Sequence, residues 1–151
     1  MEALKYFAGS RYKLYACVVM HDHVHLLIKP LIKSRVQDLV HSWKSFTAHK
    51  LRRDYGRKTP IWQEEYFDRI IRDEKEFLDK AQYIINNPLK RWPDEEEYPW
   101  VWIKEQILHR AGVSPADNDE SGRGGHGGPP YRVTVTTKEN AHIGVNFLCG
   151  S

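Results

Sequence analysis

The spacing of apolar residues near the N-terminus predicts a pair of short antiparallel strands. Tyr12–Met20 is rich in β-branched and aromatic residues, which favour strands. The polar pair His21 and Asp22 interrupts this run and predicts a tight turn. His23–Lys29 then alternates polar and apolar residues as far as Pro30, which predicts a second strand returning beside the first.

Two longer segments have apolar residues every third or fourth position, the spacing of amphipathic helices. The first is Val36–Tyr55, which follows a Ser-x-x-Gln capping box beginning at Ser34 and ends at Gly56. The second is Glu74–Asn87, which we expect to end at Pro88 because proline disfavours helical backbone in the residue before it.

Shorter patterns complete the expected elements. Met1–Ser10 predicts the end of a helix, Ile61–Gln63 and Tyr66–Arg72 predict extended backbone, and Trp100–Leu108 predicts a short final helix. Tyr131–Thr137 alternates apolar and polar residues and could form a strand, but the sequence offers it no obvious partner.

Composition divides the chain into one domain and a tail. A chain of 151 residues fits one domain, which we place at residues 1–109. Residues 110–151 are predicted to be a low-complexity, disordered tail, because the segment opens with a stretch rich in Gly, Pro, Asp and Ser. The two cysteines, Cys17 and Cys149, are too few for a disulfide framework, and no apolar run could span a membrane, so a cytoplasmic protein is expected.

Basic residues gather in the segment that contains the first long helix. Between Lys33 and Lys58 there are eight Lys and Arg residues against Asp38 and Asp54. Such a patch suits a polyanion, although a solvated helix face is the plainer interpretation. The candidate DNA contacts in this segment are Lys44, Lys50, Arg52, Arg53, Arg57 and Lys58.

Two imidazoles are expected on one face of the second strand. Alternate residues of a strand share a face, so His23 and His25 would point the same way while Val24 points into a core. Two imidazoles and one amide oxygen form a plausible open site for Mn²⁺ or Mg²⁺, and zinc also stays possible. Surface or core histidines are the alternative for such a pair.

One tyrosine of the second long helix lies off its apolar stripe. Tyr83 is expected to face away from the core, one helical turn from Asn87. A phenol beside a divalent cation could attack a scissile phosphate. The ordinary alternatives are a packing role for Tyr83 and a helix-end role for Asn87.

An ordered series of short motifs makes this chain similar to a known family. The motifs are His23-Val24-His25, Trp62-Gln63, Tyr66-Phe67-Asp68-Arg69, Ile71-Arg72-Asp73 and Tyr83-Ile84 followed by Asn86-Asn87-Pro88. Together they resemble the REP-associated tyrosine transposases, which are IS200-like, single-tyrosine members of the HUH superfamily. The resemblance covers roughly Arg11 to Trp102, and the order of the motifs makes it specific.

The resemblance implies a fold, a reaction and a set of roles. The fold would be an α+β, ferredoxin-like antiparallel sheet with helices on one face. His23 and His25 would be paired ligands of Mg²⁺ or Mn²⁺, with Asn87 as a third ligand. Tyr83 would be the nucleophile that forms a 5′-phosphotyrosine link to single-stranded DNA. The partners would be palindromic or hairpin DNA, bound by a monomer or a homodimer.

The chain departs from the family pattern at three places. His21 and Asp22 stand where the family has a Pro-Asn pair. The resemblance predicts a further interior strand ahead of Tyr12, for which the eleven preceding residues are too few, so we expect either an upstream start or a truncated copy with unpaired neighbouring strands. The tail matches nothing in the family. Two alternatives to a transposase therefore stay open: a hairpin-binding protein without catalysis, and an RNA-binding domain of similar topology, which the absence of an RNP-type aromatic pair disfavours.

Overall fold

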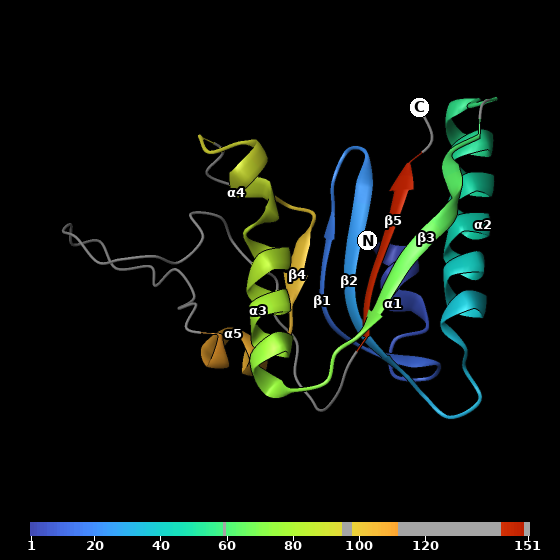
Figure 1. The fold of residues 1–151 in the computed structure, drawn as a ribbon. Helices are drawn as coiled ribbons and strands as arrows, with labels where there is room; N and C mark the ends of the chain where they lie inside the picture. Colours follow the sequence, from blue (N-terminus) through green and yellow to red (C-terminus); the bar gives the residue numbers. More distant parts are fainter. Residues whose placement is uncertain (59, 95–97, 112–142, 150–151) are drawn as a thin grey trace.

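The protein is an α+β domain built on one antiparallel sheet, as the sequence predicts (Figure 1). The computed structural model describes residues 1–58, 60–94, 98–111 and 143–149. The five strands lie in the order β3-β5-β2-β1-β4 and every pairing is antiparallel. In chain order the elements are α1 (Glu2–Tyr6), β1 (Tyr12–Val19), β2 (His23–Pro30), α2 (Val36–Tyr55), β3 (Trp62–Ile70), α3 (Glu74–Ile85), α4 (Asn87–Arg91), β4 (Val101–Ile103), α5 (Glu105–Arg110) and β5 (Ile143–Cys149).

The predicted hairpin of β1 and β2 is the centre of the sheet, and a bulge in β1 sets its faces. Leu14 pairs with Ile28 and Ala16 with Leu27, so Tyr15 is the extra residue. A bulge places two residues of one strand opposite a single residue of the other. Tyr15 and Ala16 therefore both join the hydrophobic cluster on one face of the sheet.

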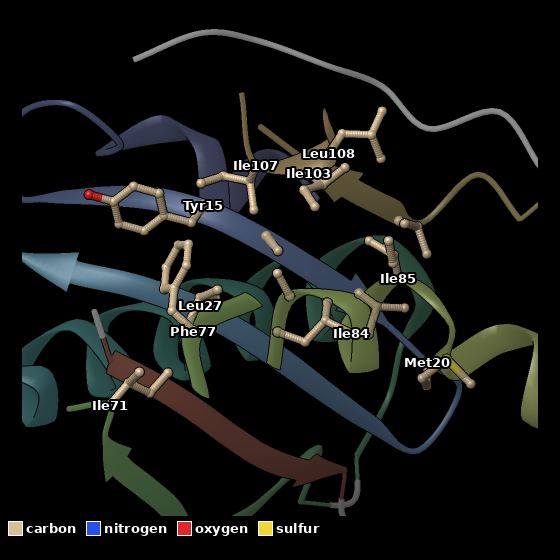
Figure 2. Packing of buried hydrophobic residues seen from close by; sticks show 14 residues of the cluster. Tyr15, Met20, Leu27, Ile71, Phe77, Ile84, Ile85, Ile103, Ile107 and Leu108 are labelled. Carbon is tan, nitrogen blue, oxygen red and sulfur yellow. The ribbon is translucent and has the colours of Figure 1, made fainter. Parts of the chain in front are cut away.

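Helices cover both faces of the sheet, which corrects the expectation of helices on one face. On the first face, α3 and α5 pack with Leu27 of β2 and Tyr15 of β1 (Figure 2). On the second face, α2 contributes Leu39, Val40 and Trp43 to a cluster with residues of β2 that alternate with the histidines. Both faces of β1 and β2 are apolar enough to bury, because Val24 and Leu26 point one way while Leu27 points the other.

The first long helix has the predicted bounds but lacks the predicted N-terminal cap. Helix α2 spans Val36–Tyr55 and ends at Gly56, whose backbone is left-handed with φ of 63°. Glycine suits this position because it has no Cβ to clash there. The residue preceding the helix is Arg35, and no side chain caps the first turn, so the predicted Ser34 capping box does not form.

The second long helix is shorter than predicted. Asp73 caps α3 by accepting a hydrogen bond from the backbone N–H of Glu76 at 2.8 Å. The helix ends at Ile85, and Asn87 begins a separate short helix, α4. Pro88 therefore lies in the first turn of α4, where proline is tolerated because its missing N–H has no helical partner.

The apolar segment near residue 105 is half strand and half helix. The sequence predicts one helix over Trp100–Leu108, but Val101–Ile103 forms β4 beside β1, and α5 follows. A short apolar run fits a buried strand and a buried helix equally well, so its spacing alone does not separate them.

The C-terminal segment supplies an interior strand that the sequence does not predict. Ile143–Cys149 forms β5, which pairs with β2 on one side and with β3 on the other. Residues 110–151 are therefore not wholly a tail outside the fold, and a strand lies beside β2 where a missing strand was expected to leave unpaired backbone. The predicted strand Tyr131–Thr137 falls outside the described residues.

Candidate active site

The two strand histidines lie together on the sheet face covered by α3. Their ring centroids are 4.6 Å apart with an interplanar angle of 68°, and both side chains are partly buried. Val24 between them is buried in the cluster on the opposite face. The period-two alternation of the strand therefore produces the pair, as the sequence predicts.

A carboxylate orients the first of these imidazoles. Nδ1 of His23 lies 2.6 Å from Oδ1 of Asp22, and Nε2 of His21 lies 3.5 Å from Oδ2 of the same residue. Although desolvation opposes it, the hydrogen bond with His23 and the charges of both imidazoles lower the pKa of Asp22 below its ordinary value. When Nδ1–H of His23 donates this hydrogen bond to the ionised carboxylate of Asp22, the lone pair of Nε2 is left for a metal ion.

The tyrosine of the candidate site lies against the second imidazole. The ring centroids of Tyr83 and His25 are 5.4 Å apart, with an interplanar angle of 74°. Helix α3 fixes this placement because Ala81, Ile84 and Ile85 are buried on the sheet while Tyr83 is 42% exposed. The structure therefore brings together His23, His25 and Tyr83, which are far apart in the sequence.

Positive charge surrounds the tyrosine ring, which the sequence analysis did not assign to the site. The Lys90 Nζ lies 4.3 Å from the centroid of the Tyr83 ring and the Lys80 Nζ lies 5.9 Å from it. Lys80 could have been inferred from its position one turn before Tyr83. Lys90 could not, because it lies on α4, beyond the break between the two helices.

A small hollow joins the tyrosine to the edge strand β3. It has a volume of about 100 Å³, and its polar lining residues are His25, Arg69, Lys80 and Tyr83. Arg69 reaches across to α3, where its Nε donates to Glu76 Oε1 at 2.7 Å. The hollow is thus a mostly basic recess on the histidine face of the sheet.

Asn87, the third predicted metal ligand, differs from Tyr83 in burial and lies on a different helix. Asn87 is buried at the first position of α4, whereas Tyr83 is exposed on α3. Within the described part of the chain, no group of three or more His, Cys, Asp or Glu side chains is arranged to hold a metal ion. A carboxamide would have to complete the pair of imidazoles, so the ligand role of Asn87 stays a prediction.

The basic residues of α2 lie on the other side of the sheet from the histidines. The Lys44 Nζ donates to the backbone carbonyls of Gln63, Glu64 and Glu65 at 2.7–3.1 Å, which ties α2 to the start of β3.

Other members of this set are exposed near the C-terminal end of α2. Lys50 and Arg53 both pair with Asp54, at 3.5 Å and 2.7 Å. Arg52, Arg57 and Lys58 are also exposed. This end of α2 and the turn between β1 and β2 lie at the same end of the molecule (Figure 1). DNA binding by these residues stays a prediction.

A model of a known protein family matches more than half of this chain. The model described as "Transposase IS200 like" matches residues 4–87. The chain therefore belongs to the IS200-like transposase family. Among the described residues, no helix is long and apolar enough to cross a membrane.

Two relatives from Haemophilus influenzae are similar to the chain. One is named "Putative REP-associated tyrosine transposase" and is 25% identical over 119 residues, which cover 70% of this chain and 66% of the relative. The other is named "Uncharacterized protein" and is 45% identical over 38 residues, which cover 25% of this chain and 21% of the relative. The chain thus spans just under two thirds of the length of the first relative. No solved structure matches it.

Proposed function

We propose that this protein is a metal-dependent DNA transposase that cuts and rejoins single-stranded DNA through a covalent link to Tyr83. The observation that carries the proposal is the contact between the rings of Tyr83 and His25. A phenol is a weak nucleophile at neutral pH, so a catalytic tyrosine needs a cation beside the phosphate that it attacks. His25 and Tyr83 line the same recess, and the ring of His23 lies beside that of His25.

His23, His25 and Asn87 would hold the ion, which we propose to be Mg²⁺ or Mn²⁺. The partial burial of both imidazoles and the Asp22 carboxylate on His23 fit a metal site, because a second hydrogen bond commonly orients a ligating histidine. When bound, the ion would polarise the scissile phosphate and stabilise the negative charge that develops on it.

Tyr83 would carry out the covalent step. Its oxygen attacks phosphorus and loses its proton to solvent, so that a new O–P bond forms and the bond from phosphorus to the 3′ oxygen breaks. The departing 3′ oxygen takes up a proton from solvent and leaves as a hydroxyl, and the 5′ phosphate stays on the tyrosine. Attack by a 3′ hydroxyl on this phosphotyrosine reverses the step and rejoins a strand. Lys80 and Lys90 would attract the phosphate to the phenol, because both ammonium groups lie over its ring.

The DNA partner would be a palindromic or hairpin end, bound by a monomer or a homodimer in the cytoplasm. The exposed basic residues at the C-terminal end of α2, namely Lys50, Arg52, Arg53, Arg57 and Lys58, would contact its phosphates. Lys44 is a weaker candidate, because its ammonium already donates to three carbonyl oxygens.

The covalent link is the first prediction that tests this function. A labelled single-stranded DNA with a palindrome should form a protein–DNA adduct with Mg²⁺ or Mn²⁺, and the Tyr83→Phe variant should form none. Denaturing gel electrophoresis measures the adduct. Tyr55→Phe is a matched control, because Tyr55 is also an exposed helical tyrosine but lies on α2.

The metal arm of the experiment separates catalysis from binding. EDTA, and separately the His23→Ala and His25→Ala substitutions, should abolish the adduct while hairpin affinity is retained. The second candidate function, a hairpin-binding protein without catalysis, predicts affinity for the hairpin with no adduct in either metal. An adduct that survives in Tyr83→Phe would refute the role given to this residue.

A further inference from the structure

Phe67 is a large apolar side chain that the fold leaves in solvent. It lies in β3, at the edge of the sheet, and is 65% exposed. Neither hydrophobic cluster of the described residues includes it. An exposed aromatic side chain contributes little to stability, so packing in the core does not explain why a phenylalanine occupies this position.

The alternation of β3 directs Phe67 toward the histidine face. Tyr66 packs against the cluster beneath α2, so the next residue along the strand points to the opposite face. The register of the sheet agrees, because Phe67 is opposite Asn146 of β5, which in turn is opposite His25 of β2. Residues that are paired across neighbouring strands share a face.

Phe67 also lies close to the recess that contains Tyr83. Two strand spacings separate its backbone from that of His25, or roughly 9.5 Å. Arg69 lies two residues after Phe67 in β3 and on the same face, so the backbones of these two residues are about 6.7 Å apart along the strand. Arg69 lines the recess together with His25, Lys80 and Tyr83.

This part of the face is less covered than the rest of the sheet. Helix α3 packs on β1, β4 and β2, while β3 is at the edge beyond β5 (Figure 1). An exposed aromatic ring thus lies beside a basic recess. Single-stranded nucleic acid is bound by this combination, because positive charge attracts its backbone and an aromatic ring stacks with its bases.

We propose that Phe67 is a base-stacking subsite for single-stranded DNA, next to the phosphate held at Tyr83. This inference rests on the proposed function, since it assigns a place to the nucleotide that flanks the cleaved bond. The basic side chains of the recess attract the backbone of the strand, and the ring of Phe67 receives one of its bases.

The test compares two probes that differ only in their bases. One is fluorescein-labelled oligo(dA), and the other is an oligonucleotide of equal length made of abasic sites. Binding to the full chain is measured by fluorescence anisotropy in EDTA, so that no cleavage occurs. Phe67→Ala should weaken oligo(dA) binding by roughly 5- to 150-fold, the range expected for loss of one stacked base, and leave abasic binding unchanged.

Three further variants separate stacking from other effects. Phe67→Leu retains an apolar side chain without a ring and should lose oligo(dA) affinity as Phe67→Ala does. Phe67→Trp should keep the affinity, and its indole fluorescence should be quenched by oligo(dA). Ile70→Ala is the matched control, because Ile70 is on the same strand, is 68% exposed and lies on the opposite face. It should bind both probes like the unchanged protein.

Two results would overturn the proposal. One is oligo(dA) binding that is the same in Phe67→Ala, Phe67→Leu and the unchanged protein, as expected if Phe67 docks another protein. The other is an equal loss for both probes, which would mean that Phe67 supports the fold rather than a base. Both outcomes are independent of adduct formation, so failure of stacking and failure of the Tyr83 reaction are distinguishable.

Discussion

At the scale of single residues, position on a strand or helix decides which side chains share a face. His23 and His25 share a face because a strand repeats every second residue, and that relation is local. The contact between His25 and Tyr83 is not local, because it depends on how α3 packs across the sheet. The sequence alone therefore predicts the imidazole pair but cannot place the phenol beside it.

Lys44 shows how a residue type can mislead. Its charge and its position in a basic helix suggest a phosphate contact, yet its ammonium donates to three consecutive carbonyls of β3. Burial lowers the pKa of Lys44, although the charge of Glu64 opposes this. Nothing in the spacing of α2 distinguishes Lys44 from the exposed Lys50.

Tyr12 makes stability depend on pH in the alkaline range. Its hydroxyl donates to the Leu4 carbonyl at 2.6 Å and accepts from Trp43 Nε1 at 3.3 Å. Burial is the main cause that raises the pKa of Tyr12 to about 12, while the hydrogen bond with Trp43 lowers it in part. In the unfolded chain this pKa is about 10. The folded state therefore keeps its proton where the unfolded state has lost it.

The second prediction follows from that difference. The contribution of Tyr12 is fully present below pH 10 and is lost as pH rises from about 10 toward 12, by on the order of 2 kcal/mol. Urea unfolding at a series of pH values measures it. Tyr12→Phe should show a shallower decline over this range, whereas Tyr55→Phe, an exposed control, should match the unchanged protein. Equal slopes for Tyr12→Phe and the unchanged protein would contradict the assignment.

At the scale of elements, local pattern predicts the long helices and the central hairpin well. The bounds of α2 and the start of α3 follow from apolar spacing and from Gly56 and Asp73 at their ends. The errors fall where the pattern is short. Pro88 lies in the first turn of α4 instead of ending α3, and the apolar residues after Trp100 are divided between β4 and α5.

The third prediction concerns the cap of α3. Asp73→Ala should lower the free energy of unfolding by about 1 kcal/mol, because the N–H of Glu76 loses its acceptor. Chemical denaturation measures the change. Asp79→Ala is the matched control on the same helix, where the exposed pair with Lys75 should contribute less than about 0.5 kcal/mol. A cost at Asp79 equal to that at Asp73 would contradict the capping role.

At the scale of the whole molecule, the C-terminal strand joins the edge strand to the rest of the sheet. In the strand order, β5 lies between β3 and β2, so the ladder of β3 depends on a segment from the far end of the chain. Composition suggested disorder for this region because the segment opens with residues that disfavour regular structure. Composition carries no information about pairing with distant strands. The pairing of β5 becomes visible only when the open edges of β2 and β3 are known.

The fourth prediction is that the chain ending at residue 142 loses β3 as a protected strand. Without β5, the amides of β3 should exchange with solvent far faster, and the melting temperature should fall. Hydrogen exchange followed by mass spectrometry measures the first effect, and calorimetry measures the second. A chain ending at Cys149 is the control and should behave like the full chain. Unchanged protection of β3 in the shorter chain would contradict its dependence on β5.

Local periodicity and an ordered set of motifs were enough to determine the α+β class, the hairpin with its imidazole pair, the two long helices and the family. These features depend on residues close together in the chain or on a one-dimensional order of short blocks. Tertiary packing alone decided that helices cover both faces of the sheet and that β5 enters it. It also placed Tyr83 against His25 and the Lys90 ammonium over the Tyr83 ring. Each of these is a contact between distant segments, and its free energy comes from burial and pairing that no single segment can form alone.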